Sequence, residues 1–186
     1  ETARREDAER ATEAFAECDF VVLACPLYTD AMPGLVKSFV ESLAPYAGRS
    51  DNPAFGFVIQ SGFSEATHSR HLERYFEKLT GRLGAPYAGT ALKGGGEGIR
   101  MMPDRANAKL FERMRAFGAD LARDGRFDQE RLRDHSGLER FSPMRAALTK
   151  AVQRVPLASW YWNSQLKRNG AWERRFDAPY AEAFRG

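Results

Sequence analysis

Three short apolar runs alternate with stretches of helical periodicity along the first two-thirds of the chain. The runs are Phe20–Cys25, Ala54–Gln60 and the weaker Tyr87–Leu92. Each is apolar over most of its length, which is typical of strands covered on both faces in a parallel sheet. We therefore expect three parallel strands in sequence order, with the second strand between the other two.

The segments between these runs predict helices, because their apolar residues recur every three or four positions. The alternation of helices and strands predicts right-handed crossovers and an α/β fold with helices on both faces of the sheet. Gly84 is placed to end one of these helices. The expected helices cover Glu6–Ala16, Leu35–Leu43, Ala66–Leu83 and Pro103–Arg123.

Residues 125–186 follow a different pattern, mostly polar and then aromatic around Trp160–Trp162. We expect an α/β domain over residues 1–124 and a C-terminal helical and aromatic extension over residues 125–186, packed on the same domain. Large apolar side chains favour burial. The side chains of Trp160, Trp162, Leu166 and Trp172 are therefore expected to cover apolar surface or to form a homodimer contact.

The composition excludes some classes of protein. No apolar run approaches the ~18 residues of a membrane span, and the charged residues 1–17 do not resemble a secretory signal. The net charge of +3 comes from basic residues spread along the chain, which does not indicate a nucleic-acid-binding protein. Cys18 and Cys25 are expected to be two buried thiols of a reduced cytoplasmic protein, held apart by the first strand.

The candidate chemistry lies where the three strands end. Ligands of open α/β sheets bind at the carboxyl ends of the strands, where this chain has the segments Pro26–Gly34, Ser61–Glu65 and Gly94–Ile99. The first two could hold a flat heterocycle, although their patterns also fit ordinary strand-to-helix connections. The glycine-rich third segment matches neither a phosphate-binding loop nor a dinucleotide fingerprint, and it is expected to be a flexible rim loop.

No catalytic triad or metal cluster is apparent. His68, His71 and His135 are interpreted as surface histidines, since none has the spacing of paired metal ligands. The catalytic residues are therefore unassigned and no metal is expected. A strand-edge site with few acid–base residues fits chemistry performed by a bound organic cofactor.

One segment carries a family resemblance. Residues Cys25–Lys37 read Cys-Pro-Leu-Tyr-Thr-Asp-Ala-Met-Pro-Gly-Leu-Val-Lys, which combines a Pro-x-Tyr loop with a Met-Pro-Gly-x-x-Lys helix start. This run resembles the flavodoxin-like NAD(P)H-dependent FMN reductase family, and Gln60–Ala66 and Lys93–Ile99 resemble the family's next two loops. The resemblance covers about two-thirds of the chain. It implies a flavodoxin-like three-layer sandwich with a parallel sheet, FMN as cofactor and NAD(P)H as reductant.

The resemblance also implies a binding site formed by two loops. The first loop would touch the flavin ring and ribityl chain, and the second would flank the ring. The cofactor-binding residues implied in this way are Pro26, Leu27, Tyr28, Thr29 and Met32 from the first loop, and Ser61, Gly62 and Phe63 from the second.

The chain departs from the family pattern at its start. The family's first strand and the loop that binds the FMN phosphate have no counterpart, so the strand at Phe20 corresponds to the third strand of the family. We expect the sequence to be N-terminally truncated relative to the family. Loss of the phosphate-binding amides should leave only weak FMN binding, and the open edge at Phe20–Leu23 should favour aggregation.

The expected function is that of a flavin-dependent oxidoreductase, with a small-molecule electron acceptor such as free flavin or a quinone. No nucleic-acid or membrane partner is expected, and a homodimer is possible. Two alternatives are a flavodoxin-type electron-transfer module and a flavin-free interaction module. The slightly basic charge favours the enzyme over the carrier, because carriers that meet basic partners are usually acidic.

Overall fold

The computed structural model describes residues 2–153 and 159–178. The chain divides into two compact units, Glu1–Arg140 and Phe141–Gly186. Residues 125–140, which the sequence analysis assigned to the extension, therefore belong to the same unit as the sheet.

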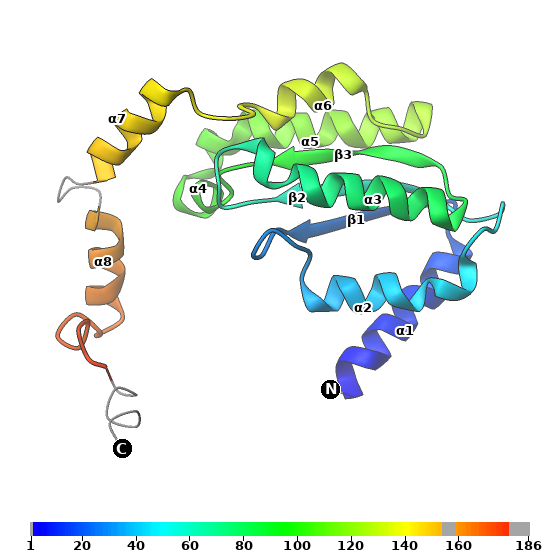
Figure 1. The fold of residues 1–186 in the computed structure, drawn as a ribbon, viewed down its shortest axis with the longest axis horizontal. Helices are drawn as coiled ribbons and strands as arrows, with labels where there is room; N and C mark the ends of the chain where they lie inside the picture. The colour runs from blue at the N-terminus through cyan, green and yellow to red at the C-terminus, as the bar shows by residue number, and fades with distance from the viewer. Residues whose placement is uncertain (1, 154–158, 179–186) are drawn as a thin grey trace. The chain divides into compact units, whose positions relative to one another are not determined.

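The sheet of the first unit has the predicted strands in the predicted order. β1 (Phe20–Pro26), β2 (Ala54–Gln60) and β3 (Tyr87–Lys93) are parallel, with β2 between the other two (Figure 1). Pro26 is opposite Gln60, which is opposite Lys93. All three strands therefore end at one edge, and the segments that follow them start side by side.

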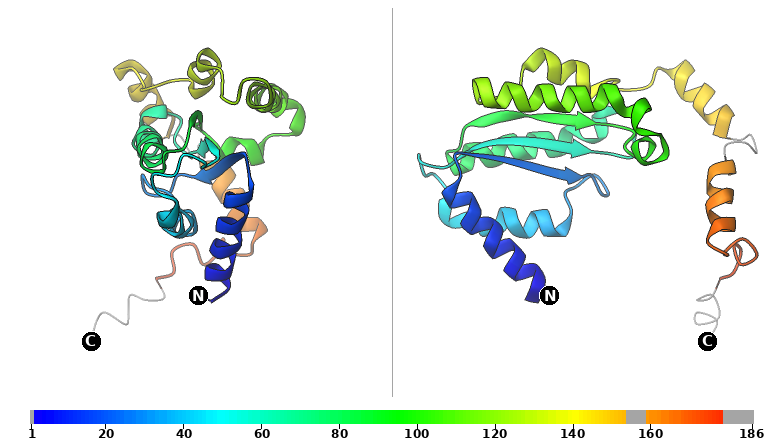
Figure 2. Two further views of the ribbon diagram at one scale, coloured as in Figure 1. Left: turned by 90° about the vertical axis from the view of Figure 1, so that its right-hand side faces the viewer. Right: turned by 180° about the vertical axis from the view of Figure 1, so that it is seen from behind.

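One face of the sheet carries the main core. It is covered by α1 (Thr2–Glu17), α2 (Gly34–Ser42) and α3 (Arg70–Leu83), as the end-on view in Figure 2 shows. Phe55 and Phe57 point to this face because they are two positions apart on β2. The Phe57 ring stacks between the rings of Phe55 and Phe76, with centroids 5.2 and 4.3 Å away. Each buried aromatic side chain contributes roughly 1.5–3 kcal/mol.

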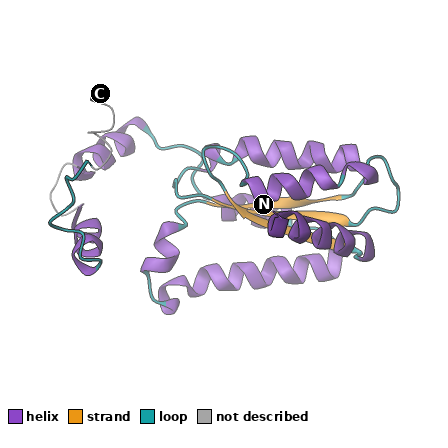
Figure 3. Cartoon of the chain, turned by 90° about the horizontal axis from the view of Figure 1, so that it is seen from below, coloured by secondary structure: helices purple, strands orange, loops and turns teal. Residues whose placement is uncertain are grey.

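The opposite face is covered by α5 (Asp104–Asp124) and α6 (Gln129–Ser136), so helices lie on both sides of the sheet (Figure 3). Phe127 is buried between them and its N–H donates to the Ala88 carbonyl at 2.8 Å. Gly89 has φ +111°, and a Cβ there would lie 2.9 Å from the Leu132 side chain. A glycine is thus required for α6 to approach β3 this closely. The expected three-layer α/β fold is confirmed.

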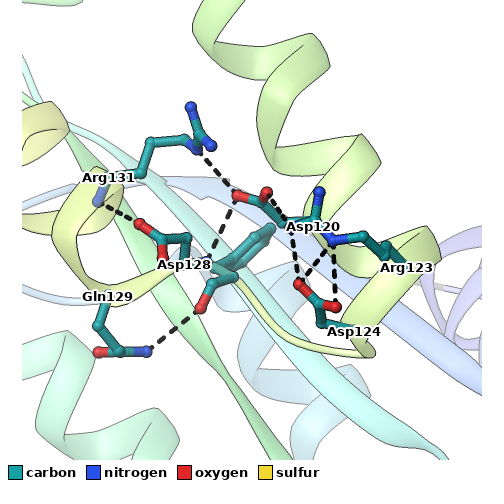
Figure 4. Close-up of polar contacts among 7 residues, drawn as sticks. Asp120, Arg123, Asp124, Asp128, Gln129 and Arg131 are labelled. Atoms are coloured by element: carbon teal, nitrogen blue, oxygen red, sulfur yellow. Dashed lines mark hydrogen bonds and ion pairs between the residues drawn. The ribbon is translucent and has the colours of Figure 1, made fainter.

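A buried carboxylate joins α5 to α6. Asp120 is 1% exposed and accepts hydrogen bonds from Arg131 Nε at 2.9 Å and Arg123 Nη2 at 3.3 Å (Figure 4). Asp128 caps α6 by accepting from the Arg131 N–H at 2.8 Å. These charge-assisted contacts fix α6 where its side chains meet β3.

The remaining short elements correct two expectations. The helix expected over Ala66–Leu83 is divided into the 3₁₀ turn η2 (Ala66–His68) and α3, which ends at the left-handed Gly84 as predicted. The glycine-rich rim loop is not purely irregular, because α4 (Glu97–Met101) begins within it. A further 3₁₀ turn, η1 (Ala44–Tyr46), follows α2.

The outer edge of β1 carries no strand among the described residues. A cavity of about 530 Å³ lies along it, lined mainly by apolar side chains of α1, β1 and α2, including Val22 and Leu35. The two thiols differ: Cys25 is buried in the main core, whereas Cys18 lines the cavity and is exposed, so the expectation of two buried thiols was wrong for Cys18. Cys18 lies beyond the end of α1, just before β1, outside the packed core.

The second unit contains α7 (Pro143–Gln153) and α8 (Trp160–Arg168). Trp160 and Trp162 are exposed, and the Trp172 ring lies beneath the guanidinium of Arg175, 3.9 Å from its centroid. The predicted role of these aromatic side chains in packing or dimerisation stays a prediction. Residues 154–158 and 179–186 of the expected extension lie outside the described residues.

Candidate functional site

The candidate site begins where hydrogen bonding continues beyond the strands. The Leu27 N–H donates to the Gln60 carbonyl at 2.7 Å, and the Ser61 N–H donates to the Lys93 carbonyl at 2.8 Å. These bonds hold the three connecting segments next to one another at the carboxyl edge of the sheet. This is the edge where open α/β sheets bind ligands.

The first segment makes a tight turn at Tyr28–Ala31. The backbones of Tyr28 and Ala31 exchange two hydrogen bonds of 2.9 and 3.0 Å, and the residues between them, Thr29 and Asp30, have φ angles of +49° and +59°. A left-handed conformation is costly for a β-branched residue such as Thr29. Strained backbone of this kind clusters at functional sites and persists only where surrounding contacts hold it.

The second segment presents an exposed aromatic ring. Ser61 is buried, and its Oγ accepts a hydrogen bond from the Phe63 N–H at 3.0 Å, which shapes the turn. Phe63 is 56% exposed. Gly62 between them faces open space, since a Cβ there would meet only Glu97 Cγ at 3.9 Å.

The third segment holds the second in place. The N–H groups of Gly95 and Gly96 donate to the carbonyls of Phe63 and Ser61 at 2.9 and 2.8 Å. A Cβ on Gly94 would lie 2.8 Å from two carbonyl oxygens of the second segment. Gly94 therefore has a structural task, which is to let the two loops pack backbone against backbone.

His68 connects the first loop to the second. Its ring stacks on Phe63 with centroids 4.3 Å apart, its Nδ1 lies 3.9 Å from Asp30 Oδ1, and its Nε2 lies 3.8 Å from Glu65 Oε2. The structure thus brings the turn at Asp30 and the ring of Phe63 together although they are far apart in sequence. The described residues include no group of three or more His, Cys, Asp or Glu side chains arranged for a metal ion.

The eight sequence-predicted site residues differ in exposure. Tyr28, Thr29, Gly62 and Phe63 are exposed. Leu27 is buried in the main core, and Met32 packs against it, so these two positions could meet a ligand chiefly through their backbone. Pro26 is half-buried and Ser61 is buried. Their role in flavin binding stays a prediction.

The histidines show what the sequence interpretation missed. His71 is exposed as expected, whereas His68 is partly covered by Phe63. His135 is only 6% exposed, so its assignment to the surface was wrong. It is covered because α6 packs on β3 and α5, and the polar sequence of α6 gives little sign of that packing. For His68, the sequence offers one indication of a polar neighbour, which is Glu65 three positions earlier.

Comparisons with known proteins give structural similarity alone. No protein-family model and no curated protein matches the chain. An NADPH-quinone reductase from P. pentosaceus is similar at 17% identity and a TM-score of 0.46, over 55% of this chain and 68% of that one. An NADH:FMN oxidoreductase in its apo form is similar at 18% identity and a TM-score of 0.45, over 74% and 68% of the two chains.

A Trp repressor binding protein from Bacillus subtilis is also similar, at 18% identity and a TM-score of 0.44, over 74% of this chain and 78% of that one. Within the described residues, no helix is long and apolar enough to cross a membrane. The α/β fold rests on the parallel sheet and its two helical layers, which the structure shows directly.

Proposed function

We propose that the protein is a flavin-dependent oxidoreductase that uses NAD(P)H to reduce bound FMN and then reduces a small acceptor such as a flavin or a quinone. The observation that carries the proposal is the joining of two loops by His68. The His68 ring stacks on Phe63, and its Nδ1 lies 3.9 Å from Asp30 Oδ1 in the Tyr28–Ala31 turn, at the edge of the sheet where open α/β sheets bind ligands. The motif of Cys25–Lys37, which resembles FMN reductases, contains that turn.

The residues of the two loops suit a flat, partly apolar ring. The Tyr28 and Phe63 side chains are 64% and 56% exposed, so both aromatic rings are accessible to a ligand. The backbone around Gly62 is open to close approach. FMN bound there would supply the hydride acceptor and the electron donor, while the loops would orient its ring and exclude water from one side.

In this proposal the two loops contact the flavin ring and the ribityl chain, and neither loop contacts the FMN phosphate. Backbone N–H groups at a helix N-terminus normally hold such a dianion. We therefore expect FMN binding by this chain to depend mainly on ring contacts and to be weak. A variant that blocks the ring should consequently lower the measurable affinity.

Gly62→Val tests the proposed contact. The added side chain enters open space beside Glu97, so the protein should fold normally while the ring is excluded. We expect the variant to bind FMN about tenfold more weakly in a fluorescence titration, the loss of roughly one good stacking contact. Gly118→Val, on α5 with no atom near its Cβ, is the matched control. Unchanged FMN affinity in Gly62→Val would show that Gly62 does not contact the bound flavin.

A further inference from the structure

A second cavity, of about 220 Å³, lies between β3, α5 and α6. It is lined by Lys93 from the end of β3, by Lys109, Leu110 and Arg113 from α5, and by His135 from α6. None of the eight residues predicted to bind flavin lines it. Three of its five lining side chains are basic and none is acidic.

His135 has no polar partner at this cavity. It is 6% exposed, and neither ring nitrogen makes a hydrogen bond within the described residues. Its ring meets Phe117 edge-on with centroids 5.1 Å apart. Buried polar groups are nearly always paired, so an unpaired imidazole beside a cavity indicates a missing partner.

The charges around His135 are of one sign. Burial, then Arg113 and Lys93, lower the pKa of His135 to about 4. Burial and Arg113 also lower the pKa of Lys93, whose Nζ donates to the Gly94 carbonyl. No ion pair found within the described residues includes Lys93, Lys109 or Arg113, and the neighbours of His135 on α6, Arg133 and Asp134, are exposed.

We propose that this cavity binds a phosphate group, either as inorganic phosphate or as the end of a phosphate monoester. A phosphate supplies the acceptor oxygen that the His135 N–H lacks and the negative charge that Lys93, Lys109 and Arg113 lack in an ion pair within the described residues. The Arg113 guanidinium can donate to two of its oxygens at once, and the lysines act as point charges. The volume suits one small anionic group with a few waters and is below that of drug-sized ligand sites. The site is independent of the proposed flavin chemistry.

The proposal predicts linkage between phosphate and the His135 proton. An anion in the cavity favours the imidazolium, so phosphate, which is a monoanion at the pH where His135 titrates, should raise the pKa of His135 by about one unit. The measurement is the His135 ring signal in NMR spectra, assigned with His135→Phe and followed against pH with phosphate and with sodium chloride at equal ionic strength. The ring of Phe117 gives His135→Phe an apolar neighbour, so this variant should fold.

Two α5 variants test the basic side chains. Lys109→Gln combined with Arg113→Gln should weaken phosphate binding about tenfold or more, because two charge-assisted contacts are lost. Both residues are exposed, so folding should be retained. Arg115→Gln, exposed on the same helix and outside the cavity, should bind phosphate like the unchanged protein.

Glycerol phosphate distinguishes the two sources of the phosphate group. Tighter binding of glycerol phosphate than of inorganic phosphate would assign the site to a monoester, and the reverse order would assign it to the free anion. The proposal is overturned if phosphate and chloride move the His135 signal equally, or if the double variant keeps full affinity. Either result would mean that water fills the cavity. Absence of FMN binding would leave these outcomes unaffected.

Discussion

Phe63 and His68 stack with their ring centroids 4.3 Å apart and 25° between the ring planes. The other side of His68 reaches Asp30, whose carboxylate lies 3.9 Å from Nδ1. One imidazole thereby lies between a side chain on the turn after β2 and the strained turn after β1. This relationship defines the candidate site more closely than the strand order alone.

Replacing His68 should loosen the two loops. His68→Ala removes the ring beneath Phe63 and the group facing Asp30, and aromatic stacking of this kind contributes about 0.5–1.5 kcal/mol. We expect FMN affinity to fall by about two- to thirteenfold, the range that this free energy gives. His71→Ala is the control, because His71 is exposed and contacts Arg74 on its own helix. Equal affinities of the two variants in a fluorescence titration would show that His68 does not order the site.

Two glycines test the packing of α6 on β3. Gly89→Ala should destabilise the fold by roughly 2 kcal/mol or more, since alanine is strained at φ +111° and its Cβ would meet Leu132. Gly118→Ala, inside α5 with open space at its Cβ, should stabilise the protein by about 0.5–1 kcal/mol. Urea unfolding measures both free energies. A Gly89→Ala variant as stable as the unchanged protein would contradict the packing of α6 on β3 described here.

Much of the fold could be predicted from sequence because its signals are local. Three apolar runs and the helical stripes between them predict the parallel sheet, and the ends of those runs predict where its loops gather. His68 and His135 could not be assigned in this way. Contact between His68 and Asp30 depends on two loops meeting in space, and burial of His135 depends on Phe127 bringing a polar helix onto β3.

The buried Asp120 should matter more than its exposed neighbour. Asp120→Ala leaves Arg131 and Arg123 without their shared acceptor and should cost about 2–3 kcal/mol of unfolding free energy, moderated because both guanidinium groups can turn to water. Asp124→Ala removes only an exposed pair with Arg123 and should cost about 0–1 kcal/mol. Similar urea midpoints for the two variants would contradict a structural role for Asp120.

The two thiols should differ in reactivity and pH dependence. Burial raises the pKa of Cys25 from 9.0 to about 11. The folded state therefore keeps this proton where the unfolded chain releases it, so the stabilising contribution is complete below pH 9.0 and declines as the pH rises toward 11. A thiol reagent at neutral pH should label exposed Cys18 rapidly and Cys25 only with denaturant. Cys25→Ala should reduce the loss of stability at alkaline pH, and fast labelling of both thiols would contradict the burial.

Anaerobic reduction of FMN by NADH or NADPH tests the proposed function most directly. The protein is mixed with FMN, NADH or NADPH is added without oxygen, and flavin absorbance is followed with time. The account predicts that flavin absorbance falls only when the protein is present and that a quinone restores the absorbance. The fall should be strongly slowed in Gly62→Val but not in Gly118→Val. The account would be contradicted if the bound flavin were reduced by neither NADH nor NADPH, or if reduction were equally fast without the protein.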